Sequence, residues 1–129
     1  MNKFRFRKFK IYRDARNFIK ELKEIIKKQF PKEEQFSLTS QLFRALDSIV
    51  LHLAEGADRG TDKDFAHYLN GSHTSLNEVV ACLDIALDQK YITDNQQKIF
   101  LQQAEGLANQ LTAFRNKLLK EPNEVKVKC

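Results

Sequence analysis

Residues 42–56 of this chain read LFRALDSIVLHLAEG, and the spacing of their aliphatic side chains decides the fold. Large apolar residues recur at the i, i+4, i+7 and i+11 positions that share one helical face, namely Leu42, Leu46, Ile49 and Leu53. At about 100° per residue the opposite face holds a second row, which is Arg44, Ser48, Leu51, Glu55 and, if the helix continues, Arg59. Charged, hydroxyl and leucine side chains in one row indicate contact with another subunit or partner. We therefore predict an assembly or structural role for this Arg44 row.

The same helical spacing recurs in three other segments. We expect helices over residues 11–29, 35–58, 61–89 and 94–120, with Pro31 after the first and Thr61 capping the third. Their apolar rows are Ile11, Ala15, Phe18, Leu22 and Ile25; Phe65, Leu69, Ser72, Leu76, Val79, Leu83 and Ala86; and Phe100, Ala104, Leu107, Leu111, Phe114 and Leu118. Four amphipathic helices with short connections predict an all-α fold, an antiparallel up-and-down four-helix bundle.

Length and composition are those of one small helical domain. The 129 residues are 42% hydrophobic and include four Gly and two Pro. We expect a single domain over 1–129, with a basic N-terminal arm at 1–10 and a frayed C-terminal tail at 121–129. No apolar run approaches the roughly 20 residues of a membrane span, and the basic N-terminus lacks a signal-peptide core. Cys82 and Cys129 are poorly placed for a structural disulfide, so we expect a cytoplasmic protein without a membrane partner.

Positive charge is concentrated at the N-terminal end. Residues 1–35 hold twelve Lys and Arg against five Asp and Glu, whereas the other 94 residues hold ten against twelve. Such a patch indicates a polyanionic partner, although a solvated lysine-rich helix face gives the same pattern. The candidate phosphate contacts are Lys3, Arg5, Arg7, Lys8, Lys10, Arg13, Arg16 and Lys20.

Basic and aromatic residues alternate through the arm, from Lys3 to Lys10. Its Phe rings can either stack on bases, with the cations on phosphates, or dock on the bundle. Docking is the favoured interpretation, because an exposed phenyl ring is costly in water.

Residue patterns typical of catalysis or metal binding are missing. The chain has no Glu-x-x-His for a di-metal bundle, and its three histidines lack the neighbours of a triad or zinc site. Gly56 and Gly60 do not form a phosphate-binding loop, and the Cys82 thiol, among apolar neighbours in a helix, should stay protonated. We therefore expect no cofactor, no metal and no enzymatic activity.

Glu55 and Glu78 are the most unusual acids, because both share their rows with apolar or small residues. We expect partial burial of these carboxylates, which requires a cationic partner. Arg44 or Arg59 is the proposed partner, within the subunit or across an interface. Glu78 is therefore grouped with the Arg44 row as an assembly or structural residue.

Several short motifs, taken together in their order and spacing, resemble the pattern of a known protein family. They are Phe30-Pro31-Lys32-Glu33-Glu34, Leu38-Thr39-Ser40-Gln41-Leu42-Phe43-Arg44-Ala45, Ser48-Ile49, Ala54-Glu55-Gly56 with Arg59, Asp64-Phe65, and Ser75-Leu76-Asn77-Glu78. From about Phe9 to Leu119 the chain resembles the bacterial four-helix-bundle proteins encoded in intervening sequences of 23S rRNA genes. Where that family commonly has Pro-Ser-Asn after Ser-Ile, this chain has Val50-Leu51-His52.

The resemblance implies an antiparallel four-helix bundle that assembles into a homopentamer and a role in binding RNA. A more distant resemblance is to the accessory protein of diversity-generating retroelements, a basic pentamer that binds nucleic acid and a reverse transcriptase. Two hypotheses follow: an oligomeric nucleic-acid-binding protein, or an interaction scaffold that docks a partner enzyme such as a reverse transcriptase.

Overall fold

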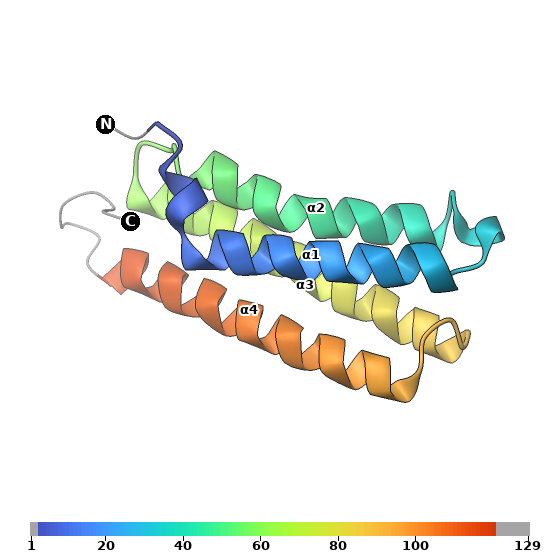
Figure 1. The fold of residues 1–129 in the computed structure, drawn as a ribbon. Coiled ribbons are helices and arrows are strands. Elements are labelled where there is room, and N and C mark those ends of the chain that lie inside the picture. The colour runs from blue at the N-terminus through green and yellow to red at the C-terminus, as the bar shows by residue number, and fades with distance from the viewer. Residues whose placement is uncertain (1–2, 121–129) are drawn as a thin grey trace.

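The computed structural model describes residues 3–120, so the frayed tail expected at 121–129 lies outside the described residues. Four α-helices, α1 (Lys10–Gln29), α2 (Leu38–Gly56), α3 (Asp62–Asp88) and α4 (Asp94–Lys120), follow one another along the chain. Short 3-10 turns, η1 (Arg5–Lys8) and η2 (Lys32–Glu34), precede α1 and α2. Successive helices run in opposite directions, so the predicted all-α, antiparallel four-helix bundle is confirmed (Figure 1).

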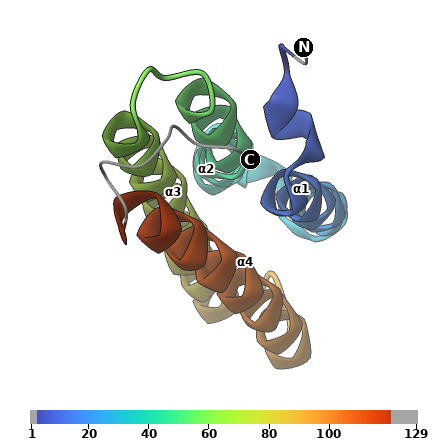
Figure 2. The same ribbon diagram turned by 90° about the vertical axis from the view of Figure 1, so that its left-hand side faces the viewer.

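The helices pack in a ring, with α1 and α3 on opposite corners. Each of them contacts both α2 and α4, and the most extensive contacts join α2 to α3 and α3 to α4 (Figure 2). The predicted α2 face of Leu42, Leu46, Ile49 and Leu53 is completely buried. The apolar rows of the other helices also enter this core, with Ile25 and Phe114 partly buried at its edge.

Helix α2 is shorter than expected, because the chain turns at both of its ends. The helix begins at Leu38 and not at residue 35, since η2 and the turn after it occupy the preceding residues. It ends at Gly56, where Ala57 follows as the C-terminal cap residue. At the start of α3, the Thr61 hydroxyl accepts a hydrogen bond from the Asp64 amide at 3.1 Å, as predicted.

Small residues let α2 and α3 approach closely. A Cβ atom added to Gly56 would lie 2.5 Å from Tyr68 Cβ, and one added to Gly71 would lie 2.7 Å from His52 Cδ2. The buried Ser72 hydroxyl donates to the Ile49 carbonyl at 2.7 Å, which satisfies its polar group inside this contact. We call this contact the α2–α3 seam.

None of the helices within residues 3–120 combines the length and the apolar composition that a membrane span requires.

Candidate functional site

The N-terminal arm folds back onto one end of the bundle. Residues Arg5–Lys8 form the turn η1, which packs against α1 and α2. Phe9 is buried, with its ring centroid 6.2 Å from that of Phe65 in α3, and Phe6 packs against the core while partly buried. The expected docking of the arm is therefore confirmed for Phe6 and Phe9, whereas Phe4 is 60% exposed.

Arg5 fastens η1 to the C-terminal end of α2. Its Nε and Nη2 atoms donate to the carbonyl oxygen of Ala57 at 3.2 and 2.6 Å. Its guanidinium carbon also lies 6.0 and 5.8 Å from the ring centroids of Phe9 and Phe65. Carbonyls at a helix C-terminus lack partners within the helix, and a cation suits the negative end of the helix dipole. Arg5, one of the predicted phosphate contacts, thus uses its guanidinium to hold the fold together.

The eight predicted phosphate contacts divide into three groups. Arg5 is half-buried against α2, and Lys10 forms an ion pair with Asp14 at 2.6 Å. The other six side chains are exposed, and they are Lys3, Arg7, Lys8, Arg13, Arg16 and Lys20.

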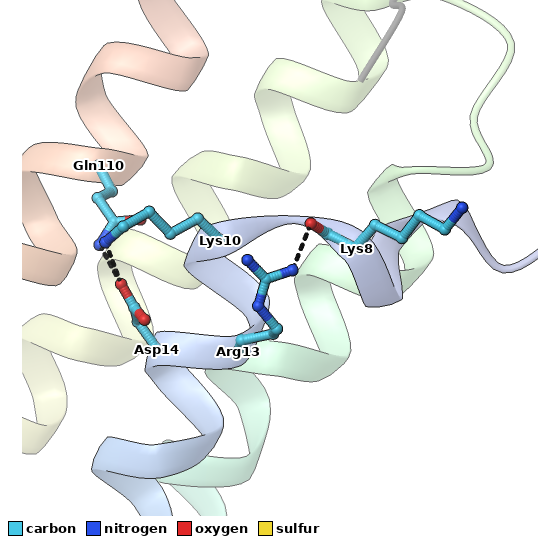
Figure 3. A network of polar contacts seen from close by, with 5 residues as sticks. All are labelled: Lys8, Lys10, Arg13, Asp14 and Gln110. Carbon is cyan, nitrogen blue, oxygen red and sulfur yellow. Dashed lines mark hydrogen bonds and ion pairs between the residues drawn. The ribbon is translucent and has the colours of Figure 1, made fainter.

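Three of the exposed cations project from one face of α1. Arg13, Arg16 and Lys20 are three and four residues apart, and with Asn17 they line a surface hollow of about 380 Å³. Arg13 Nη1 donates to the Lys8 carbonyl oxygen at 2.7 Å, which joins this face to η1 (Figure 3). We call Lys8, Arg13, Arg16 and Lys20 the α1 basic face. The sequence did not single out Asn17, whose amide offers a neutral donor and acceptor in the same hollow.

The side of α1 that faces α4 has a different character. Asp14 accepts hydrogen bonds from Lys10 Nζ at 2.6 Å and from Gln110 Nε2 at 2.9 Å (Figure 3). These bonds lower the pKa of the Asp14 carboxyl below its ordinary value. The carboxylate neutralises Lys10, and Glu21 lines the same α1–α4 groove. An anionic ligand is therefore favoured on the α1 basic face and disfavoured on this side.

The Arg44 row divides between the seam and the surface. Ser48 turns into the α2–α3 seam, where its hydroxyl accepts a hydrogen bond from Ser75 at 2.9 Å and lies 3.0 Å from His52 Nδ1. Leu51, in contrast, is 59% exposed. The sequence did not single out Gly71 of α3, which faces His52 of α2 within the same chain.

Glu55 and Glu78 are exposed, so the expectation of partial burial is wrong within one chain. Within residues 3–120 neither carboxylate forms an ion pair, because the pairs found there are Lys10 with Asp14 and Lys23 with Asp47. Arg44 is exposed, and the Arg59 guanidinium lies over the Tyr68 ring at 5.1 Å. The proposed partner within the subunit is therefore not in place, and the contact across an interface stays a prediction.

The described part of the chain also shows the surroundings of Cys82 and of the side chains that could bind a metal. Cys82 is buried in α3, and burial, with a smaller contribution from Glu78, raises the pKa of its thiol. The thiol is thus protonated at neutral pH, as the sequence predicted. Between residues 3 and 120, no three His, Cys, Asp or Glu side chains are placed to hold a metal ion together.

Comparison with known proteins gives a family and a fold. No curated protein matches the chain. A similar solved structure is a protein of unknown function from the S23 ribosomal protein family of Bacteroides thetaiotaomicron. It is 20% identical, with a TM-score of 0.56, and the match covers 88% of this chain and 99% of that one. The model of the 23S rRNA-intervening sequence protein family matches residues 7–113. This match spans most of the chain, including α1, α2, α3 and most of α4, so the protein belongs to the 23S rRNA-intervening sequence protein family.

Proposed function

We propose that this protein is a non-enzymatic RNA-binding protein that contacts phosphates through the α1 basic face. The observation that supports the proposal is the hollow of about 380 Å³ between Arg13, Arg16 and Lys20. Its lining, as far as residues 3–120 show, includes no carboxylate that would neutralise these cations or repel a phosphate. Arg and Lys side chains in such an array bind the nucleic-acid backbone without reading its sequence.

The geometry of the α1 basic face suits an extended polyanion. Helical rise places Arg13 and Lys20 about 10 Å apart along α1, so their charges follow a line and do not converge on one point. The bond from Arg13 to the Lys8 carbonyl extends the line onto η1, beside the exposed Arg7. If copies of the chain assemble, the face recurs in each copy and the combined affinity rises through avidity.

Neutralising two cations tests this function. We expect the double change Arg16→Gln and Lys20→Gln to weaken RNA binding by about tenfold at low salt, because two phosphate contacts are lost. The slope of log affinity against log salt should become shallower by about 1.4 for single-stranded RNA. Fluorescence anisotropy over a salt series measures both quantities.

The matched control neutralises two cations outside this face, with Lys98→Gln and Lys117→Gln in α4, both exposed. It removes the same net charge but should leave the affinity within about twofold, because the charge acts locally within a Debye length. If the two double variants weakened RNA binding equally, the effect would be one of net charge and not of the α1 basic face. An RNA affinity that does not change with salt concentration would contradict the proposal.

A second candidate function is that of a protein-interaction scaffold, favoured by the apolar exposure beside the α2–α3 seam. Leu51 of α2 is 59% exposed and Ile85 of α3 is 48% exposed, on outward rows that flank the seam. Glu55 and Glu78 lie on the same rows and would pair with Arg44 or Arg59 of a neighbouring copy. We propose that this face joins copies of the chain, with the pentamer implied by the family resemblance as the expected assembly, or docks a partner protein.

A charge at Leu51 tests the assembly. We expect Leu51→Glu to convert the oligomer into smaller species, because a buried carboxylate without a partner is costly in an interface. Light scattering coupled to size-exclusion chromatography measures the mass, and Ile99→Glu in α4, where Ile99 is 47% exposed, is the matched control. An unchanged mass for Leu51→Glu would exclude this face from the subunit contact.

A further inference from the structure

A second hollow lies where η1 crosses the C-terminal end of α2, and the proposed function does not use it. Its volume is about 540 Å³, within the range of roughly 300 to 1,000 Å³ typical of small-ligand sites. Phe4 and Phe6 of the arm form one apolar wall, and Ala54 of α2 with the cap residue Ala57 forms the other. The charged lining residues are Lys3, Arg5 and Asp58, two cations and one carboxylate. We call this hollow the arm pocket.

Phe4 differs from the other two phenylalanines of the arm in that it remains exposed at the arm pocket. Phe6 and Phe9 are packed against the core, yet Phe4 of the same arm stays 60% exposed. Its ring meets the Phe6 ring edge-to-face, with centroids 6.4 Å apart and planes at 82°. Phe4 is therefore a largely exposed aromatic residue at the pocket, and aromatic side chains are platforms on which a planar base can stack.

The arm that carries Phe4 is held in place. Arg5, the next residue, donates two hydrogen bonds to the Ala57 carbonyl, which belongs to the opposite wall of the pocket. The two walls are thus bonded to each other, and Phe4 is positioned before any ligand arrives. Such preorganisation reduces the ordering cost of binding.

Asp58 supplies an unused acceptor in the same pocket. Its side chain is exposed, and its carboxylate makes no hydrogen bond or ion pair with another residue of the 3–120 range. A carboxylate has acceptor sites only, so it prefers a ligand with N–H donors and disfavours a phosphate. Lys3, an exposed residue of the same lining, is the matching site for a phosphate.

We propose that the arm pocket binds one unpaired base of single-stranded RNA, with guanine preferred. The base stacks on Phe4, and the Asp58 oxygens accept hydrogen bonds from the adjacent N1–H and N2–H groups of guanine. Lys3 contacts the phosphate of that nucleotide. Sequence-specific RNA recognition by proteins commonly combines a stacked base with contacts to its Watson–Crick edge. The inference rests on the proposed RNA-binding function and narrows its ligand to unpaired RNA.

Phe4→Ala tests the stacking. With short single-stranded oligoribonucleotides, whose binding is read by fluorescence anisotropy, we expect about a tenfold loss of affinity, within the range measured for single stacked bases. Phe4→Trp should retain the affinity. The matched control is Phe36→Ala, because Phe36 is 89% exposed and precedes the other end of α2. Phe36→Ala should change the affinity by less than about twofold, and circular dichroism checks that each variant is folded.

Asp58→Asn tests the base preference. Wild-type protein should bind a guanine-containing oligonucleotide more tightly than one of adenine and uracil alone, and Asp58→Asn should reduce this difference. Unchanged affinity in folded Phe4→Ala, or an unchanged base preference in folded Asp58→Asn, overturns the arm-pocket inference. The proposed function survives that result if Arg16→Gln with Lys20→Gln still weakens binding, whereas a wild-type chain that binds no RNA overturns both.

Discussion

Phe65→Ala is expected to lower the free energy of unfolding by about 3 to 5 kcal/mol, which is the usual cost of truncating a buried phenylalanine. Phe65 is 1% exposed and has the largest side chain of those that are fully buried. Its ring packs against Phe9 of the arm and Phe114 of α4, with centroids 6.2 and 5.2 Å away. The ring also lies beneath the Arg5 guanidinium. Truncation therefore leaves a cavity where three segments meet and loosens the arm as well.

Urea unfolding followed by circular dichroism measures this effect. Phe36→Ala is the control, since Phe36 is 89% exposed and its loss should change stability by less than about 0.5 kcal/mol. If Phe65→Ala cost less than about 1 kcal/mol, the packing described here would be wrong at this junction. Arm detachment adds a second signature, because a folded Phe65→Ala protein should be cleaved by trypsin after Arg5 or Arg7 more readily than wild type.

Gly56→Ala is expected to destabilise the protein by about 1 to 3 kcal/mol, although alanine is normally the better helix former by about 1 kcal/mol. The added Cβ would lie 2.5 Å from Tyr68 Cβ and 3.0 Å from Phe65 Cδ1. Tyr68 Cβ is fixed to the backbone of α3 and cannot rotate away, so the two helices must separate. Separation also stretches the Ser72 hydrogen bond to Ile49, which spans the seam.

Gly106→Ala is the matched control, and its effect should have the opposite sign. Gly106 lies inside α4, where an added Cβ meets nothing within 4 Å. The alanine should therefore stabilise the protein by about 0.5 to 1 kcal/mol through backbone entropy. Thermal unfolding of the two variants, compared with wild type, measures the sign of the stability change for each. Stabilisation by Gly56→Ala would show that the α2–α3 seam is looser than the structure indicates.

The four helices and the residues of the core were predictable from local sequence patterns. Burial on one side of a helix leaves a regular spacing, so the row from Leu42 to Leu53 could be assigned without coordinates, and all four of its residues are buried. The N-terminal cap of α3 was also predictable, because the Thr61 hydroxyl and the Asp64 amide that it binds are only three residues apart. The start of α2 was placed too early, because the turn after η2 depends on how α1 and α2 are joined as well as on helix propensity.

Only part of the candidate site was predictable from the sequence. Clustering of cations near the N-terminus is a property of composition, so the α1 basic face could be anticipated. Which of these cations can contact a ligand depends on the tertiary structure. Arg5, for example, binds the Ala57 carbonyl, fifty-two positions away in the chain, and no local pattern encodes such a contact. The tertiary structure also brought Phe4 and Asp58 to one pocket and turned Gly71 towards His52. Periodicity identifies the face of a helix that is buried, but only packing between distant segments determines which polar groups meet there and which stay free to bind.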